Sequence, residues 1–266
     1  MTKMYTKENL KINIDVNELT ELILERLETK QPLSIVRIGD GEIAIMNANP
    51  NDKGCKHFYY VHLGRTLEPN VMNEISNNLK ESIINCDVLG ITSKTSEESD
   101  NLYWKISKDV LLDILSKNTI KPKMFCSMGV HYDFVSQKKL DIILNKVNEV
   151  YLVTSRDVES KFKEKYKNLE SVHLYRIPGE YVYEDEKKFE DYYPNVYKKI
   201  ESDFLGKDMS GKLLLIGGGF VGKNLGVIFS NRGGVSIDLG SVFDNFVGKI
   251  TRGVGKGPNK YREPLL

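Results

Sequence analysis

The sequence predicts an α/β fold with a Rossmann-like, largely parallel sheet and helices on both faces. Short apolar runs typical of buried strands alternate along the chain with longer segments that carry apolar residues at helical spacing. Glycine or polar residues follow several of the apolar runs, where a strand would turn into the next helix. Strands that alternate with helices in this way form parallel sheets, because each helix returns the chain to the same edge.

Each expected strand is a short apolar run, and each expected helix has an amphipathic pattern or follows a turn signal. The expected strands are 33–36, 86–91, 123–127, 150–154, 171–177, 212–216 and 235–238. The expected helices are 16–29, 43–46, 69–85, 102–116, 135–147, 157–167, 184–202 and 220–231. The segment 49–60 is turn-rich and then aromatic, and we assign no helix to it.

The composition limits the class of protein. The chain has 266 residues, 40% of them hydrophobic, which is enough for one large core. We therefore treat 1–266 as a single domain that ends in a basic flexible tail, 249–266. The formal net charge of +1 argues against a dedicated nucleic-acid binder. Three scattered cysteines without zinc spacing, a charged N-terminus and the lack of a long apolar run favour a cytoplasmic protein without a signal peptide.

The segment VRIGDGE, residues 36–42, brings two carboxylates close together just after a buried strand. Open α/β sheets bind ligands at the carboxyl ends of their strands. Asp40 and Glu42 would repel each other without a positive partner, and Mn²⁺ or Mg²⁺ prefers oxygen ligands of this kind. Gly39 and Gly41 belong to the same loop. The alternative is an Asp-Gly turn in which Glu42 opens a helix.

Arg37 is a charged residue at the end of an otherwise apolar strand. A lone arginine there is costly unless it is paired. Two interpretations stay open for it, namely a salt bridge that orients Asp40 or Glu42 and direct binding of a phosphate.

Gly217 and Gly219 begin a G-x-G-x-x-G pattern between a very hydrophobic expected strand and the next helix, in the segment that ends at Lys223. Such a loop lets backbone amides approach a phosphate at the helix N-terminus. Asp238, on the following strand, stands where a ribose-binding acid could stand. The alternative is tight packing of strand against helix, for which glycine alone suffices.

Ser127 and His131 lie just past the end of strand 123–127, so we expect both to face the same cleft. His131 could serve as a general base, because the ordinary pKa of histidine lies near neutrality, or it could be an ordinary residue at the start of a helix. Tyr103-Trp104 could stack on a sugar or uracil, or pack in an aromatic core.

The C-terminal tail is basic. Its cations are Lys249, Arg252, Lys256, Lys260 and Arg262, with glycine and proline between them. Such a segment could form a lid that clamps a diphosphate, or it could touch an anionic membrane surface where lipid-linked acceptors lie. A disordered terminus is the third interpretation.

Two of these motifs together resemble bacterial glycosyltransferases with the fold called GT-D. They are VRIGDGE near the N-terminus and LLLIGGGFVGKNLGVIFSNRGGVSIDLGSVFD near the C-terminus. The segments FYYVH, DVLGIT, Tyr103-Trp104 and FCSMGVHYDF lie between them in the order of that family, so the resemblance covers about residues 30–248.

The resemblance implies a metal-dependent transfer of a sugar from a nucleoside-diphosphate sugar, usually UDP-linked, to a surface-glycan or glycoprotein acceptor. Asp40 and Glu42 match the family's Asp-x-Glu metal motif, and Arg37 matches the arginine ahead of it. Asp238 and Gly240 match its C-terminal Asp-x-Gly.

Two positions depart from the family pattern. Ser241 stands where the family often has histidine, and Gly218-Gly219-Phe220 stands where it often has Gly-Pro-Thr. These differences bear on which sugar is used. The residues that we assign to donor binding are Arg37, Gly39, Gly41, Ser127, Gly217, Gly218, Gly219, Lys223, Asp238 and Ser241.

The favoured function is a hexosyltransferase in the cytoplasm, and a tail that touches the membrane would place it at the inner face. A Mn²⁺ or Mg²⁺ ion on Asp40 and Glu42 would neutralise the leaving diphosphate, and His131 and Asp238 are the other residues assigned to catalysis. If the enzyme inverts, a carboxylate or histidine in the cleft would deprotonate the acceptor, but the sequence does not show whether it inverts or retains. Two alternatives remain. One is a NAD(P)-dependent oxidoreductase that uses the loop Gly217–Gly222, and the other is a non-catalytic subunit that binds a nucleotide sugar.

Overall fold

The computed structural model describes residues 5–47, 53–65, 67–93, 98, 100–118, 123–180 and 191–249. Within these residues, seven strands form one sheet in the order β3-β2-β1-β7-β6-β4-β5, and every neighbouring pair is parallel. The strands are β1 Leu33–Arg37, β2 Val88–Ile91, β3 Met124–Ser127, β4 Glu149–Thr154, β5 Ser171–Arg176, β6 Leu213–Ile216 and β7 Val235–Asp238. The predicted α/β fold with a largely parallel sheet is confirmed.

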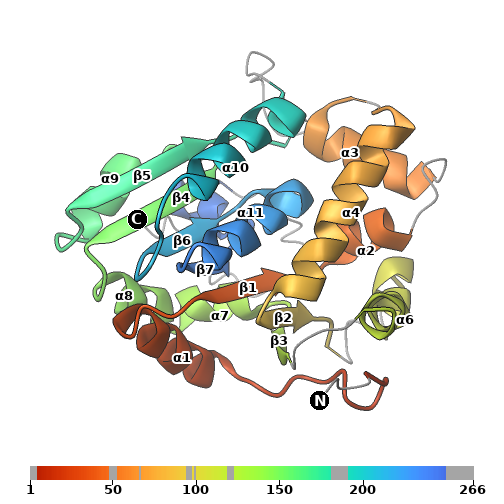
Figure 1. Cartoon of the computed structure of the whole chain (residues 1–266), viewed down its shortest axis with the longest axis horizontal. Helices are drawn as coiled ribbons and strands as arrows, with labels where there is room; N and C mark the ends of the chain where they lie inside the picture. Colours follow the sequence, from red (N-terminus) through yellow and green to blue (C-terminus); the bar gives the residue numbers. More distant parts are fainter. Residues whose placement is uncertain are drawn as a thin grey trace.

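Helices connect the strands and cover the sheet (Figure 1). They are α1 Val16–Glu28, α2 Asp40–Asn47, α3 Lys53–Leu63, α4 Pro69–Asn85, α6 Leu102–Ser116, α7 Val130–Ser136, α8 Lys139–Leu144, α9 Glu159–Lys165, α10 Tyr197–Leu205, α11 Gly219–Asn231 and α12 Val242–Phe246. A π-helical turn, η1 Tyr192–Val196, precedes α10. Among the described helices, none is both long enough and apolar enough to cross a membrane.

The sheet separates two hydrophobic cores, because successive strand residues face opposite sides. On β4, Tyr151 and Val153 belong to one core, whereas Val150 and Leu152 belong to the other. The first core is closed by α2, α3, α4, α6, α10 and α11, and the second by α1, α7, α8, α9 and α12. In Figure 1, α4, α10 and α11 cross the viewer's side of the sheet. Burial on both faces explains why the strands are nearly continuous apolar runs in the sequence.

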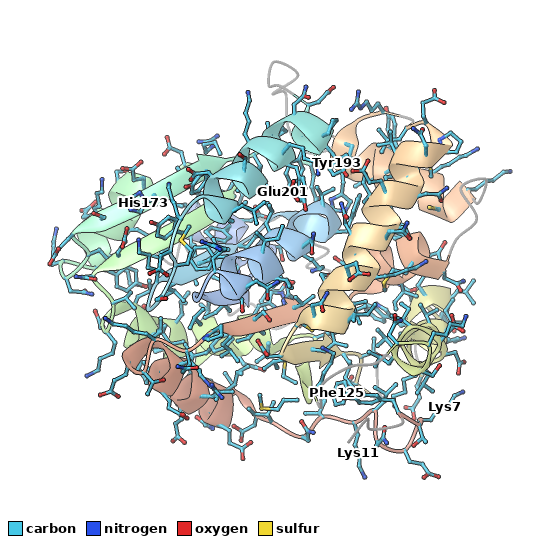
Figure 2. The ribbon with its side chains drawn as sticks, viewed as in Figure 1. Lys7, Lys11, Phe125, His173, Tyr193 and Glu201 are labelled. Carbon is cyan, nitrogen blue, oxygen red and sulfur yellow. The ribbon has the colours of Figure 1, made fainter. Side chains whose placement is uncertain are left out.

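The order of the strands creates a natural ligand site in the middle of the sheet. Phe125 on β3 and His173 on β5 mark the two edge strands, which lie on opposite sides of the molecule (Figure 2). From β1 the chain adds β2 and β3 toward one edge, and it then crosses to the other side of β1, where β4 to β7 lie with the last strand, β7, next to β1. Open α/β sheets bind ligands where the strand order changes direction in this way.

Two caps show how local sequence sets the starts of helices. At α1, Asp15 accepts hydrogen bonds from the backbone N–H groups of Asn17 and Glu18, and the Glu18 carboxylate accepts one from Asp15 N, which completes a capping box. At α6, Asn101 accepts from the N–H groups of the next helical turn. The second cap matters for the site, because Asn101 also contacts an acid of VRIGDGE.

Several helix predictions need correction. The expected helix 135–147 is two helices, α7 and α8, since the chain turns at Lys138, whose φ is +55°. The described part of 49–60 belongs to α3, and α12 was not expected at all. Of the expected helix 184–202, the described part begins with η1, and α10 starts only at Tyr197. Residues 184–190 of that expected helix lie outside the described residues, and so does the basic tail from residue 250 on.

Candidate active site

The carboxyl ends of the neighbouring strands β1 and β7 are joined by Arg37 and Asp238. The backbone N–H of Arg37 donates to Asp238 Oδ2 at 3.2 Å, its Nε donates to the Asp238 carbonyl oxygen at 2.8 Å, and one terminal nitrogen donates to Asp238 Oδ1 at 3.2 Å. Of the two interpretations of Arg37, the salt bridge is therefore observed, with Asp238 as the partner in place of Asp40 or Glu42. Gly240, with φ +51°, leaves room for this contact, since a Cβ there would lie 2.3 Å from the guanidinium.

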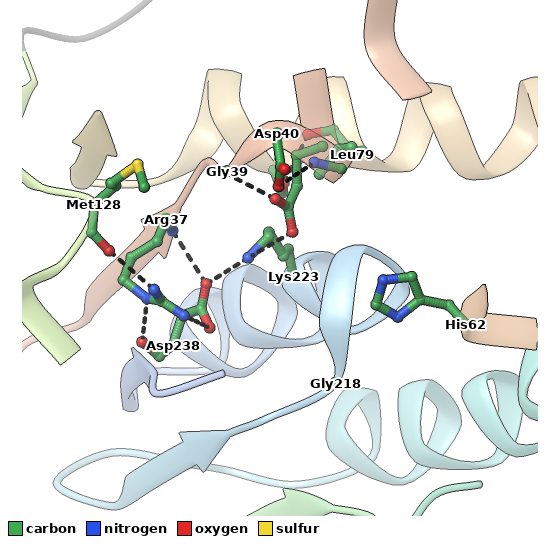
Figure 3. A network of polar contacts seen from close by, with 12 residues as sticks. Arg37, Gly39, Asp40, His62, Leu79, Met128, Gly218, Lys223 and Asp238 are labelled. Carbon is green, nitrogen blue, oxygen red and sulfur yellow. Dashed lines mark hydrogen bonds and ion pairs between the residues drawn. The ribbon is translucent and has the colours of Figure 1, made fainter. Parts of the chain in front are cut away.

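Lys223 of α11 connects Asp238 to the VRIGDGE segment (Figure 3). Its ammonium nitrogen lies 2.6 Å from Asp238 Oδ2 and 3.2 Å from Glu42 Oε1, and the side chain is only 5% exposed. The predicted positive partner of Glu42 is thus present within the protein itself. Arg37, Asp238, Lys223 and Glu42 form a buried network of two cations and two anions.

Both carboxylates of this network are held in the ionised form. Burial by itself raises the pKa of Asp238, but the positive charges of Arg37 and then Lys223 outweigh it and hold the pKa well below its usual range. Burial also raises the pKa of Glu42, and Lys223 again reverses the effect, so that the net pKa is lowered. The two carboxylates therefore stay ionised and balance the charges of Arg37 and Lys223.

His131 contacts the same network from α7. One terminal nitrogen of Arg37 lies 2.8 Å from His131 Nδ1 and also donates to the Met128 carbonyl oxygen at 2.9 Å. Because arginine only donates, Nδ1 must accept, and the neutral ring carries its proton on Nε2. Burial, and then the charge of Arg37, lower the pKa of His131 well below that of an exposed histidine. This imidazole is therefore neutral and a weakened base.

The other residues predicted past β3 and β7 have mainly local contacts. Ser127 Oγ accepts from Gly129 N at 3.1 Å, which shapes the turn before α7. Ser241 Oγ lies 3.2 Å from the Tyr132 hydroxyl, so it links the start of α12 to α7. Both lie at the same edge of the sheet as the network.

Asp40 and Glu42 both lie in the first turn of α2, as the turn-and-helix interpretation of VRIGDGE expected. Asp40 accepts from Gly41 N at 2.9 Å through Oδ1 and from Asn101 Nδ2 at 3.0 Å through Oδ2. Glu42 Oε2 accepts from Gly39 N at 2.8 Å. Both side chains are half-buried.

These contacts leave room for the metal interpretation as well. Each carboxylate oxygen can accept two partners, and each oxygen of Asp40 has one. No group of three His, Cys, Asp or Glu side chains that could hold a metal is found among the described residues. Mg²⁺ and similar ions commonly use one or two carboxylates, with substrate phosphates and water as the other ligands. Asp40 and Glu42 fit that mode of binding.

The glycine loop between β6 and α11 is tightly packed. A Cβ on Gly217 would lie 2.5 Å from the Phe243 ring, and one on Gly218 would lie 2.6 Å from the Tyr192 hydroxyl. Packing therefore accounts for these two glycines. Gly219 has φ +56°, a conformation that glycine adopts at no steric cost, and it begins α11. The loop therefore places the amino end of α11 at the edge of the sheet.

Aromatic packing is observed at the start of α6. The Tyr103 and Phe58 rings meet edge to face, with centroids 5.8 Å apart, and Tyr103 packs against the first core. The core interpretation of Tyr103 is the one that its contacts favour.

Three contributors to this region were not predicted. Asn101 and the Met128 carbonyl are ordinary in sequence, and no local pattern marks them. His62 lies in the segment FYYVH, which is one of the landmarks of the resemblance, but no role was assigned to it. Its ring lies beside the glycine loop, where a Cβ on Gly219 would be 3.3 Å from His62 Nδ1.

Comparison with known protein families and solved structures identifies the family and the fold of this chain. The profile of the GT-D fold-like domain matches residues 14–246, and the chain belongs to this GT-D-like family. Two structures of domain of unknown function 1792 are similar in fold, each with a TM-score of 0.50 and 13% identity over 87% of this chain and 78% of theirs. One is selenomethionine-substituted, and the other is described as having a distinct glycosyltransferase fold.

A third similar structure is a glycosyltransferase of the same 1792 group from Streptococcus sanguinis, with 18% identity and a TM-score of 0.46 over 88% of this chain and 83% of that one. No curated protein matches the sequence. The predicted GT-D fold is thus confirmed, and membership of a family with a glycosyltransferase fold supports a glycosyltransferase as the class of activity.

Proposed function

We propose that this protein transfers a hexose from a UDP-sugar to a hydroxyl group of a surface glycan or glycoprotein, with the help of Mn²⁺ or Mg²⁺. The observation that carries the proposal is the meeting of two elements at the central edge of a GT-D-like sheet. One is the acidic turn of α2, and the other is the amino end of α11, which Lys223 ties to it.

The donor diphosphate has a physical reason to lie at the amino end of α11. The first backbone N–H groups of a helix lack partners within the helix, and the helix dipole favours negative charge there. The glycine loop keeps side chains away from this approach. Asp40 and Glu42 are the residues that would hold the cation, whose charge would stabilise the leaving nucleoside diphosphate.

The contacts of Asp238 weigh against a NAD(P)-dependent oxidoreductase. An acid that binds ribose must offer its carboxylate to the ligand, whereas both oxygens of Asp238 are engaged by Arg37 and Lys223 and the residue is 5% exposed. Burial and ion pairing suit a role in holding β1, β7 and α11 together.

A panel of UDP-sugars assayed for UDP release, with Mn²⁺, with Mg²⁺ and with EDTA, tests the proposal. We expect one sugar to give release that depends on the cation and increases with a glycan acceptor. Full activity in EDTA would contradict the metal assignment. UDP binding without release or transfer would favour the non-catalytic subunit, and a thermal shift with NAD(H) alone would favour the oxidoreductase.

The acceptor and the cellular site follow from the same proposal. We propose that the acceptor is a glycan or a glycoprotein. We also propose that the basic tail contacts the inner face of the membrane, where a lipid-linked acceptor would lie. Transfer to a lipid-linked acceptor in vesicles with anionic lipid, compared with neutral vesicles, measures that contact. Equal rates in both would argue against it.

A further inference from the structure

A second polar cluster lies at the same edge of the sheet, on the other side of the glycine loop. His62 at the end of α3 faces Glu180, beyond the end of β5, with 3.3 Å between His62 Nδ1 and Glu180 Oε1. The two side chains are 12% and 22% exposed. They line a cavity of about 50 Å³ together with Ser155, Tyr192 and the glycine loop. No sequence motif predicted a role for this cluster.

The imidazole is fixed by three different elements. α3 carries it, the Phe220 ring of α11 packs against it at 4.9 Å and 78°, and the Glu180 carboxylate lies 3.3 Å from Nδ1. Figure 3 shows His62 pointing toward the amino end of α11, near Gly218. A substrate whose diphosphate bound at that helix end would therefore have its sugar close to this ring.

The charge beside each histidine distinguishes His62 from His131. A carboxylate that accepts the Nδ1 proton fixes the tautomer, leaves the lone pair on Nε2 and stabilises the imidazolium form. His62 has a carboxylate beside it in Glu180, whose Oε1 lies 3.3 Å from Nδ1. His131 Nδ1 instead accepts from the Arg37 guanidinium, a permanent cation, which disfavours protonation of the ring.

We infer that His62 is the general base for the acceptor hydroxyl and that Glu180 is its positioning residue; this rests on the function proposed above. In the step, His62 Nε2 takes the proton of the acceptor O–H as that oxygen bonds to the anomeric carbon of the donor. The bond from the anomeric carbon to the diphosphate oxygen breaks, and its electron pair leaves with the nucleoside diphosphate. A single displacement of this kind inverts the anomeric configuration. The imidazolium that forms lies beside the Glu180 carboxylate.

Kinetics of His62→Gln test this role, with His57→Gln as the matched control, because His57 is an exposed residue on the same helix. We expect His62→Gln to lower kcat for transfer by about 10²-fold or more, the usual contribution of a general base, with UDP affinity within twofold of wild type. His57→Gln should leave both unchanged. A wild-type kcat in His62→Gln would overturn the inference, and so would a loss confined to UDP affinity.

Proton NMR gives a readout that needs no activity. The chain has four histidines, so the ring signals can be assigned with single His→Gln variants. Glu180→Gln should lower the pKa of His62, because a neutral amide no longer stabilises the imidazolium. Among the described residues that line the cavity, Glu180 and Tyr192 are the titratable groups besides His62. Tyr192→Phe is the control, and it should leave the pKa of His62 unchanged. An unchanged His62 pKa in Glu180→Gln would overturn the pairing.

The two proposals fail in distinguishable ways. If the wild-type protein neither binds UDP nor transfers a sugar, both the proposed function and the assignment of His62 as the base are wrong. If wild type is active and His62→Gln transfers at the same rate, or if the product retains the donor configuration, only the base assignment falls.

Discussion

Lys223→Met is the sharpest test of the buried network. Methionine keeps most of the side-chain length but removes the charge from a site that is 5% exposed. Asp238 then keeps Arg37 as a partner, whereas Glu42 loses its cation and keeps the hydrogen bond from Gly39 N. Removing one partner of a buried ion pair costs about 3–5 kcal/mol. Because Asp238 stays paired, we expect the lower end, about 3 kcal/mol.

Urea denaturation at pH 7 measures this loss directly, as a shift of the midpoint at constant slope. In a thermal melt, a domain of this size should lose about 6–12 °C, at about 2–4 °C per kcal/mol. Lys198→Met is the control, since Lys198 is 49% exposed and pairs with Glu201 at 2.9 Å on the surface of α10. Exposed pairs contribute about 0–1 kcal/mol. A loss in Lys223→Met no larger than in this control would refute the role of the network.

The pH dependence of the same variant gives a second check. In the folded protein the pKa values of Glu42 and Asp238 are lowered, so their stabilisation is fully present above the unfolded pKa, about 4, and is lost as the pH falls through the folded pKa. Lys223→Met should raise both folded pKa values. The difference in unfolding free energy between wild type and variant should therefore be largest near pH 7 and shrink below about pH 4. A difference that grows in acid would contradict the network.

Three further predictions concern the donor site. Asp40→Asn and Glu42→Gln should each abolish cation-dependent UDP binding by calorimetry while circular dichroism shows a folded protein; normal binding with Mn²⁺ would contradict the metal assignment. Gly219→Val places a side chain at φ +56° and should cost about 1–2 kcal/mol of stability, but it should weaken UDP affinity by more than that, and an unchanged affinity would leave the loop to packing alone. Removing residues 250–266 should lower activity and leave the melting temperature unchanged; wild-type kinetics would assign the tail to a disordered terminus.

The inner strands could be predicted from the sequence because they are buried on both faces, whereas the edge strand β5 has only Val172 buried. Continuous apolar runs such as Leu213–Ile216 are typical of a strand in the middle of a layered α/β sheet, and the glycine loop after this run indicates where the strand ends. Helix boundaries were harder. Nothing in the pattern of 135–147 shows that Lys138 adopts a left-handed conformation that divides the segment, because lysine has no preference for it.

The pairing within the candidate site could not be predicted for a topological reason. Arg37 and Asp238 are separated by 201 positions in the chain, and they meet only because β7 inserts beside β1. Strand order is not contained in the local pattern that identifies strands. The acids, the glycine loop and Lys223 could thus be placed at one edge of the sheet from the sequence, but which acid pairs with which cation could not be predicted.

The charge balance at this edge explains why a donor diphosphate would need a cation from outside the network. Arg37 and Lys223 are the cations of the network, yet each is already paired with Asp238 or Glu42, so the four together offer no net positive charge. Within the described residues, Asp40 is the acid of that turn that accepts only from neutral groups, a backbone N–H and an amide. A diphosphate would add further negative charge beside it. A divalent ion on Asp40 or the cations of the tail would restore the balance, and UDP affinity of the truncated protein with and without Mn²⁺ separates the two contributions.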